Sequence, residues 1–182
     1  MSWFDLNLKW KILGYFAENS DKEIYVSQLA SEINSGKGVT SVILHDLKNE
    51  GILKSKKYGN ALFYSLNDNF LTRELKVLYF LNKIWESDLI NYFIDNDNNI
   101  EYLAVYGSHI QGTNQQDSDI DLLVITSSKS DLITDEMEEK LNKKISITKL
   151  SLGTWLKLKR KKDTFYQTIH LNHRVLIGDE LP

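Results

Sequence analysis

The chain contains no cysteine, and its single proline, Pro182, stands at the last of its 182 positions. The lack of cysteine excludes a disulfide framework and any thiolate metal site. Because proline is absent elsewhere, turns and helix ends have to be made by Gly, Asn, Asp and Ser. No apolar run approaches the ~20 residues that a membrane span needs, and no N-terminal segment has the form of a secretion signal. We therefore expect a cytoplasmic protein with no membrane partner.

An excess of positive charge is also lacking. The 22 Lys and Arg residues are opposed by 25 Asp and Glu residues, which gives a net charge of −3. Bulk charge therefore does not indicate nucleic-acid binding, and only a local cluster could do so. A hydrophobic content of 42% with 11% aromatic residues is typical of a folded globular protein. The length suits one large domain or two small ones.

The first third of the chain has a regular order of predicted elements. We expect a helix over 3–18, a short strand at 23–26, a helix capped by Ser27 that runs to residue 33, a turn at 34–38, a helix over about 39–50 that Gly51 stops, and a hairpin over 52–66 with a Gly59-Asn60 turn. In the helix over 39–50, the apolar spacing predicts a core-facing side and a solvent-facing side. The core-facing residues would be Val39, Val42, Ile43 and Leu47, and the solvent-facing ones Ser41, His45 and Lys48.

This order resembles the winged helix-turn-helix transcription regulators over about residues 5–67. The segment 47–53, with the letters LKNEGIL, resembles their passage from recognition helix to wing. The resemblance implies transcription regulation through duplex DNA. Between positions 37 and 57 the sequence has five lysines and two acids, which gives a local net charge of +3. The candidate DNA-binding residues are Lys37, Lys48, Lys54, Lys56 and Lys57. The alternative is a winged helix used for dimerisation or protein contact.

Residues 70–95 form a long amphipathic stretch in which apolar residues recur every three or four positions. Such a density of leucine and aromatic residues indicates packing, so we predict a connector and a seam for a homodimer. The polar run 95–99 ends it. The predicted domains are a winged helix at 1–68, a helical linker at 69–97 and a third region at 98–182.

The third region carries the most informative motif. A short apolar run is followed by Gly107-Ser108. Further along the chain, Asp119 and Asp121 stand on either side of Ile120. Alternate residues of a strand point to the same side, so the two carboxylates should lie close together, as is tolerated when a divalent cation sits between them. The Gly-Ser turn supplies N–H groups and a hydroxyl for a phosphate. The pattern predicts phosphoryl or nucleotidyl transfer. The alternatives are a solvated strand face for the aspartates and an ordinary turn for Gly107-Ser108.

The motif resembles the signature of the DNA polymerase β-like nucleotidyltransferases, most closely their minimal nucleotidyltransferase branch, over roughly residues 98–178. The residues that carry the likeness are Gly107, Ser108, Gly112, Ser118, Asp119 and Asp121. The resemblance implies that the glycines and serines bind the nucleotide, an NTP. It also implies that Asp119 and Asp121 are catalytic and hold Mg²⁺ (or Mn²⁺). Because members of that branch often accompany a toxin, it further implies a toxin partner. His109 could touch a phosphate or base, but we expect it to face solvent.

The resemblance also implies a third acid on a later strand, and here the chain departs from the pattern. The strand expected at 144–150 carries the hydroxyls of Ser146 and Thr148 on its polar face. Glu101 or Asp163 could substitute. Three functions therefore stay open: Mg-dependent transfer of an NMP from an NTP to a protein or nucleic-acid acceptor, a DNA-binding regulator with a degenerate nucleotide-sensing domain, or an antitoxin-like partner protein.

The rest of the chain completes an α+β fold. We expect a helix over 131–142, a second helix that Ser151 caps, and a third helix over 165–171, followed by a last strand at 174–178. The second of these helices ends in the strongest basic cluster of the chain, formed by Lys157, Lys159, Arg160, Lys161 and Lys162. This cluster is either a solvated end that complements the helix dipole or a phosphate contact. The expected architecture is an N-terminal winged helix, a helical linker and a small mixed-sheet nucleotidyltransferase domain.

Overall fold

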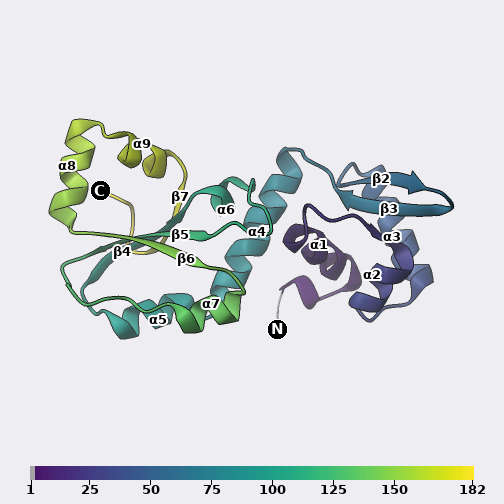
Figure 1. The fold of residues 1–182 in the computed structure, drawn as a ribbon, viewed down its shortest axis with the longest axis horizontal. Coiled ribbons are helices and arrows are strands. Elements are labelled where there is room, and N and C mark those ends of the chain that lie inside the picture. Colours follow the sequence, from purple (N-terminus) through teal and green to yellow (C-terminus); the bar gives the residue numbers. More distant parts are fainter. Residues whose placement is uncertain (1–2) are drawn as a thin grey trace. The chain divides into compact units, whose positions relative to one another are not determined.

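The computed structural model describes residues 3–182, and the chain divides into two compact units, Met1–Asn82 and Lys83–Pro182 (Figure 1). The division falls inside the linker expected at 69–97. The predicted domain boundaries themselves stay a prediction. In the described part of the chain, no helix is long and apolar enough to cross a membrane.

The first unit is a winged helix. Its elements are η1 (Trp3–Asp5), α1 (Leu8–Glu18), β1 (Ile24–Tyr25), α2 (Val26–Glu32), α3 (Lys37–Asn49), β2 (Leu53–Tyr58), β3 (Ala61–Leu66) and the start of α4 (Phe70–Glu86). The three strands form an antiparallel sheet in the order β1-β3-β2. The β2–β3 hairpin turns at Gly59, whose φ of +59° favours glycine. The expected hairpin and its turn are thus confirmed.

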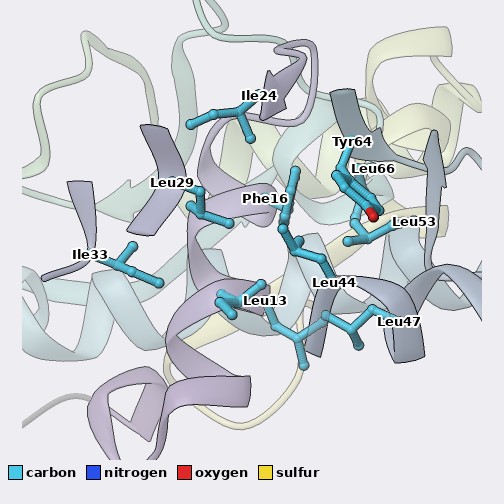
Figure 2. Packing of buried hydrophobic residues seen from close by; sticks show 11 residues of the cluster. Leu13, Phe16, Ile24, Leu29, Ile33, Leu44, Leu47, Leu53, Tyr64 and Leu66 are labelled. Carbon is cyan, nitrogen blue, oxygen red and sulfur yellow. The ribbon is translucent and has the colours of Figure 1, made fainter. Parts of the chain in front are cut away.

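One apolar core holds this unit together (Figure 2). Phe16 of α1, Leu29 of α2 and Leu44 and Leu47 of α3 are fully buried in it, and Tyr64 comes in from β3. Each such side chain stabilises the fold by about 1.5–3 kcal/mol relative to an exposed position. The recognition helix α3 is therefore fixed in place by its buried side.

Two predictions for α2 and α3 were wrong. Ser27 does not cap α2, because the N-cap is Tyr25, two residues earlier, and Ser27 lies within the helix. Val39 and Val42 do not face the core and are 50% and 60% exposed. The buried positions of α3 are Thr40, Leu44 and Leu47, which share one side of the helix at the spacing i, i+4, i+7.

The predicted helical stretches are interrupted at polar residues. Asn7 caps α1 by accepting a hydrogen bond from the N–H of Trp10 at 3.0 Å, which separates α1 from η1. The stretch over 70–95 is two helices, α4 and α5 (Leu89–Asn96). They are separated at Asp88, whose φ of +64° leaves the helical region. Hydrophobic spacing continues through both interruptions, which is why it did not reveal them.

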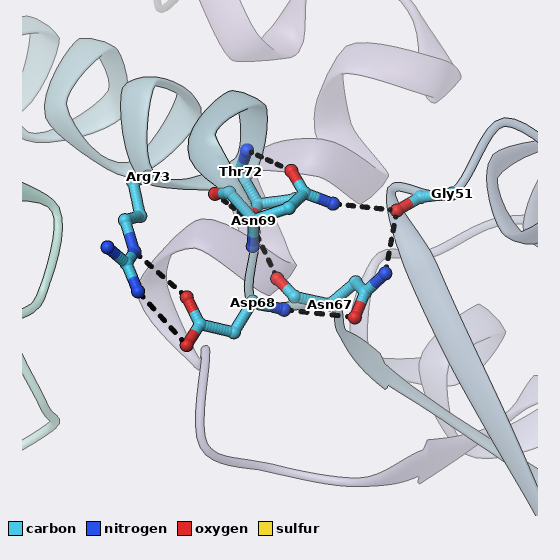
Figure 3. A network of polar contacts seen from close by, with 6 residues as sticks. All are labelled: Gly51, Asn67, Asp68, Asn69, Thr72 and Arg73. Carbon is cyan, nitrogen blue, oxygen red and sulfur yellow. Dashed lines mark hydrogen bonds and ion pairs between the residues drawn. The ribbon is translucent and has the colours of Figure 1, made fainter.

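A polar network joins the end of α3 to the start of α4 (Figure 3). The carbonyl of Gly51 accepts hydrogen bonds from the side-chain amides of Asn67 and Asn69, both at 3.0 Å. Asn69 also accepts a bond from the N–H of Thr72, whose hydroxyl accepts one from the N–H of Asn69. This reciprocal cap satisfies the first turn of α4 and ties it to the base of the wing.

The second unit is a mixed sheet with helices on both faces. Its further elements are β4 (Ile100–Tyr106), α6 (Ser108–Gln111), β5 (Ile120–Thr126), α7 (Asp135–Leu141), β6 (Ile145–Leu150), α8 (Leu152–Lys161), α9 (Thr164–Leu171) and β7 (His173–Ile177). The sheet order is β6-β5-β4-β7, with β5 and β6 parallel and the other pairs antiparallel. Helices α8 and α9 cover one face, and α5 and α7 lie on the other (Figure 1). The expected α+β fold class, with a winged helix and a small mixed-sheet nucleotidyltransferase domain, is confirmed.

Candidate nucleotide and metal site

A row of four side-chain positions crosses the sheet at the start of β5. Asp121 is the Cα partner of Tyr106 on β4 and of Ser146 on β6, and Tyr106 is the partner of His173 on β7. Partners in a sheet project to the same face, and neighbouring strands lie ~4.8 Å apart. The row therefore places the Asp121 carboxylate between Ser146 and Tyr106, on the face that α8 and α9 cover.

Gly107 makes room for this carboxylate. Its backbone has φ +79° and ψ −156°, a region that only glycine adopts readily. A Cβ built on Gly107 would overlap Oδ2 of Asp121 and come within 3.2 Å of its Cγ. The Gly-Ser turn and Asp121, which lie on one segment of the sequence, thus meet in one site.

The two aspartates differ in their surroundings. Asp119 is exposed and Asp121 is half-buried, while Ile120 between them points into the core. Burial raises the pKa of the Asp121 carboxyl, and the negative charge of Asp119 raises it further. Both causes are relieved when a cation comes to the pair, because a cation stabilises the charged form of a carboxylate.

The loop after α6 is held by the other motif residues. Gly112 ends α6 with φ +66°, and its N–H is bonded to the carbonyl of Ser108. The hydroxyl of Ser118 accepts a bond from the N–H of Gln115 at 2.8 Å. The Ser108 hydroxyl is half-buried and makes no hydrogen bond within the described chain, which leaves it available to a ligand.

The prediction that His109 faces solvent was wrong. Its side chain is only 3% exposed, and its Nε2 lies 3.2 Å from the carbonyl oxygen of Ser118. Since a carbonyl only accepts, Nε2 donates. His109 therefore ties the loop that precedes Asp119 to helix α6, a role that needs tertiary structure to be seen.

No carboxylate stands at the position where a third acid was expected. Ser146 occupies the place beside Asp121, and the hydroxyl of Thr148 lies 3.1 Å from that of Tyr106. Glu101 does not substitute, because it lies near the far end of β4, where Ile100 pairs with Thr126. Asp163 caps α9 by accepting a bond from the N–H of Phe165 at 2.9 Å.

The residues present fit one hard divalent cation. Two adjacent carboxylates meet the preference of Mg²⁺ for one or two protein carboxylates, with phosphate oxygens and water as the other ligands. Among residues 3–182, no three His, Asp or Glu side chains come together as a metal site. A cation here would therefore depend on the nucleotide for the rest of its coordination.

The sequence motif did not single out Tyr106 and His173, which the sheet brings into the row with Asp121. For Tyr106 a signal existed, since the last residue of one strand opposes the first of the next in an antiparallel pair. His173 had none, because the pairing of β7 with β4 connects distant parts of the chain.

The five lysines proposed to bind DNA are all exposed. Lys37 and Lys48 lie at the two ends of α3, and Lys54, Lys56 and Lys57 lie on β2. Lys56 rests over the ring of Tyr58, with Nζ 4.8 Å from the ring centroid. The structure thus leaves these cations open to solvent on the recognition helix and the wing.

A glycine turn that opens a short helix, followed by paired aspartates at the start of the next strand of a mixed sheet, is the arrangement of a nucleotidyltransferase-type domain. The family model described as polymerase beta, nucleotidyltransferase matches residues 87–180, just over half of the chain. The chain therefore belongs to this family, joined here to a winged helix.

Solved structures resemble parts of the chain. HlyU from Vibrio cholerae N16961 is 23% identical, covers 43% of this chain and 83% of its own length, and has a TM-score of 0.37. A toxin–antitoxin crystal structure with AMP-PNP is 20% identical, covers 52% of this chain and 73% of its own length, and has a TM-score of 0.39. A mutant form of the toxin–antitoxin pair MntA-HpeT has the same values. No curated protein matches the chain.

Proposed function

We propose that the second domain transfers an NMP from an NTP to a protein or nucleic-acid acceptor with the help of a divalent cation. The observation that supports this most is the Asp121 carboxylate lying over the bare Cα of Gly107, directly before the open hydroxyl of Ser108. This arrangement brings metal-binding oxygens and phosphate-binding groups within one ligand's reach.

Each residue would have a separate role. Asp119 and Asp121 would hold Mg²⁺ or Mn²⁺, which neutralises phosphate charge when bound. Ser108 and the backbone of Gly107 would bind the triphosphate. Gly112 and Ser118 would keep the loop closed around it, since both are engaged in loop hydrogen bonds rather than open to a ligand.

The site lacks a third carboxylate that would help to activate the acceptor. In two-metal transfer a further carboxylate helps to activate the attacking hydroxyl, and this chain has Ser146 beside Asp121 instead. Each tenfold loss of rate corresponds to ~1.4 kcal/mol of barrier. We therefore expect nucleotide binding with slow transfer, and an increase in rate when an acid is restored at position 146.

Single-turnover assays with each labelled NTP, Mg²⁺ or Mn²⁺ and mixed protein and nucleic-acid acceptors test the proposal. Asp119→Asn and Asp121→Asn should abolish both metal-dependent nucleotide binding, measured by calorimetry with a non-hydrolysable NTP, and any transfer. Ser146→Asp should raise transfer. Thr148→Asp is the matched control, because that position is engaged with Tyr106 rather than paired with Asp121.

Nucleotide binding that both asparagine variants retain would refute the metal site. Fast transfer by the wild type that Ser146→Asp lowers would show that the site is complete without a strand carboxylate. Circular dichroism of each variant has to show an unchanged fold before either result is interpreted.

The second candidate is a DNA-binding regulator whose second domain only senses nucleotide. The hydroxyl of Ser146, standing beside Asp121 where a further carboxylate would complete a two-metal site, favours it. Its signature is a change in DNA affinity on addition of NTP without any transfer, because a sensed ligand has to shift binding at the second site. A DNA affinity that is independent of nucleotide would exclude this candidate.

Association partners belong to the same proposal. Helix α4 exposes Phe70, Leu71, Leu78 and Trp85, which would suit the homodimer expected through residues 70–95. Sedimentation at several protein concentrations would detect such a dimer. The toxin partner implied by the family branch stays an expectation of the sequence.

A further inference from the structure

Helix α8 ends in a run of five cations that no acid of the described chain neutralises. We call Lys157, Lys159, Arg160, Lys161 and Lys162 the basic run. All five are exposed, and within residues 3–182 none of them makes an ion pair. Helix α8 contains no acid at all. The next acid along the chain, Asp163, is engaged as the cap of α9.

The helix dipole does not account for so many charges. One or two cations in the last turn complement the C-terminal end of a helix. Here Lys157 and Lys161 are four residues apart and Lys157 and Arg160 three, and like charges at these spacings destabilise a helix. The chain therefore carries a cost of repulsion that a bound polyanion would remove.

The basic run is displayed on a firmly anchored helix. Trp155 of α8 is fully buried against Tyr166 of α9, with ring centroids 4.8 Å apart. Its Nε1 donates a hydrogen bond to the carbonyl of Pro182 at 2.9 Å. The cations thus project from a fixed surface, which lowers the entropic cost of binding an extended ligand.

A column of rings continues from the basic run toward the candidate site. The exposed His170 stacks on Tyr166 with centroids 5.2 Å apart and planes 15° apart, and His173 follows at 6.3 Å and 21°. His173 stands in the row with Tyr106 and Asp121. Helix α9 covers ~12 Å of this path, and two strand spacings of ~4.8 Å cover the rest.

We propose that the basic run and the ring column form the docking track of a single-stranded nucleic acid whose terminal hydroxyl is the acceptor. Cations spaced along α8 fit successive phosphates, and the exposed ring of His170, backed by the buried Tyr166, fits an unpaired base. An acidic protein would be held by the cations but would have no use for the ring column. The role of the strand as acceptor rests on the proposed nucleotidyl transfer, whereas the binding of the strand does not depend on that transfer.

Fluorescence anisotropy of the full chain, without NTP or metal, tests the track. The probes are labelled single strands of RNA and of DNA, each roughly 20 nucleotides long, titrated between ~50 and ~200 mM salt. Changing all five residues of the basic run to Gln should weaken binding about tenfold or more. It should also flatten the salt slope by ~0.7 for each phosphate contact removed. The matched control changes five lysines outside the basic run and outside the proposed DNA-binding surface to Gln, which removes the same charge: Lys9, Lys11, Lys22, Lys129 and Lys140.

A second variant tests the ring column separately from charge. His170→Ala should lower strand affinity about tenfold at every salt concentration, and His170→Tyr should restore it, because stacking needs a flat ring and no charge. Comparison of RNA with DNA identifies which strand is preferred. Polyglutamate should compete poorly.

The proposal fails if the basic-run variant, with an unchanged melting curve, binds single strands like the wild type. It also fails if the lysine control loses as much affinity as the basic-run variant. It fails as well if polyglutamate displaces the strand and His170→Ala has no effect on strand affinity. The last result would assign the cations to an acidic protein. Strand binding with no NMP transfer would instead refute the proposed function and leave the track standing.

Discussion

Helices α3 and α8 both carry exposed cations and differ in what surrounds the charge. On α3 the exposed side holds Val39 and Val42, at 50% and 60% exposure, with Lys37 and Lys48 at the ends and Asp46 between. On α8 the basic run has no acid among its members. The longest run of cations in this protein thus lies on the second domain, although the first domain has the winged-helix fold.

This difference indicates two modes of recognition. Exposed valines on a recognition helix suit apolar contacts, either with thymine methyl groups in a major groove or with a protein. A run of cations without apolar neighbours suits phosphates of any sequence. If both domains bind nucleic acid, the first would contribute selectivity and the second affinity. Each of the following predictions changes one side of this comparison.

The largest effect is expected from Gly107→Ala, which should affect the second domain alone. The added Cβ would meet the Asp121 carboxylate, and alanine is strained at φ +79°. We expect nucleotide affinity to fall by up to ~100-fold, the upper end of the loss seen when groups that orient metal ligands are removed. Calorimetry with a non-hydrolysable NTP and Mg²⁺ measures it.

Gly153→Ala is the matched control, since a Cβ there meets nothing within 4 Å. Any DNA binding by the winged helix should be the same in both variants. Nucleotide affinity that survives Gly107→Ala would show that the carboxylate does not need the space above this glycine.

The next largest effect concerns four lysines of the recognition helix and wing, Lys48, Lys54, Lys56 and Lys57. Changing all four to Gln should flatten the salt dependence of duplex DNA binding by ~0.9 for each phosphate contact that is removed. Such a change corresponds to a drop of about ten- to a hundredfold in affinity at moderate salt. Lys11→Gln with Lys22→Gln serves as the control on α1 and the loop after it. A salt slope as steep in the four-lysine variant as in the wild type would assign the module to protein contact.

The sequence predicted most of the fold because its signals are local. Gly51 and the Gly59 turn need a positive φ, and alternating Ile145 and Ile147 predict a half-buried strand. These signals indicated the order of elements and both domain types. Helix interruptions such as Asp88 were missed, since hydrophobic spacing continues across them.

The site was predicted only in part, for a physical reason. Gly107, Ser108, Asp119 and Asp121 lie on one continuous segment, so their spacing carried the prediction. The positions of His109 and His173 depend on tertiary packing and on pairing between distant strands. The assignment of Val39 and Val42 to the core failed because the inward side of α3 lies about one residue further along, on Thr40, Leu44 and Leu47, which is ~100° around the helix.

A smaller effect is expected for Asp97, which stabilises the second domain away from its site. Asp97 is 4% exposed and accepts bonds from the N–H of Asn99 at 2.9 Å and from the hydroxyl of Thr126 at 2.8 Å. Its removal leaves buried donors without partners. Asp97→Ala should therefore lower the free energy of unfolding by about 1–3 kcal/mol in urea titrations. Asp95→Asn, on the exposed side of α5, should cost little.

The pH dependence of this effect has a definite sign. Burial alone raises the pKa of Asp97, but the bonds from Asn99 and Thr126 outweigh it and hold the pKa below its ordinary value. The charged form is thus favoured in the folded state, so the stabilisation is present above the ordinary pKa and is lost as pH falls through the lowered one. A difference between wild type and Asp97→Asn that increased on acidification would contradict the assignment.

The smallest effect is a gain in stability at the site of the second domain. Burial and the charge of Asp119 raise the pKa of Asp121. The folded state therefore binds a proton more readily than the unfolded state between the ordinary pKa and the raised one, and stability falls as pH rises through that window. Above this pH window the folded protein carries the full cost of holding the charged Asp121 carboxylate. Asp121→Asn should therefore slightly raise the Tm of the metal-free protein at neutral pH.

The gain should vanish below the ordinary aspartate pKa, ~3.9, because both forms of the protein are then neutral at this position. Asp119→Asn is the control, since Asp119 is exposed and its removal relieves only the charge contribution. Mg²⁺ with a non-hydrolysable NTP should reverse the order, stabilising the wild type and leaving the variant unchanged. Thermal melts at neutral and acidic pH, with and without Mg²⁺ and nucleotide, measure all three differences. A variant that melts below the metal-free wild type at neutral pH would show that Asp121 is paired in the folded chain, and that the site does not hold an uncompensated carboxylate for a cation.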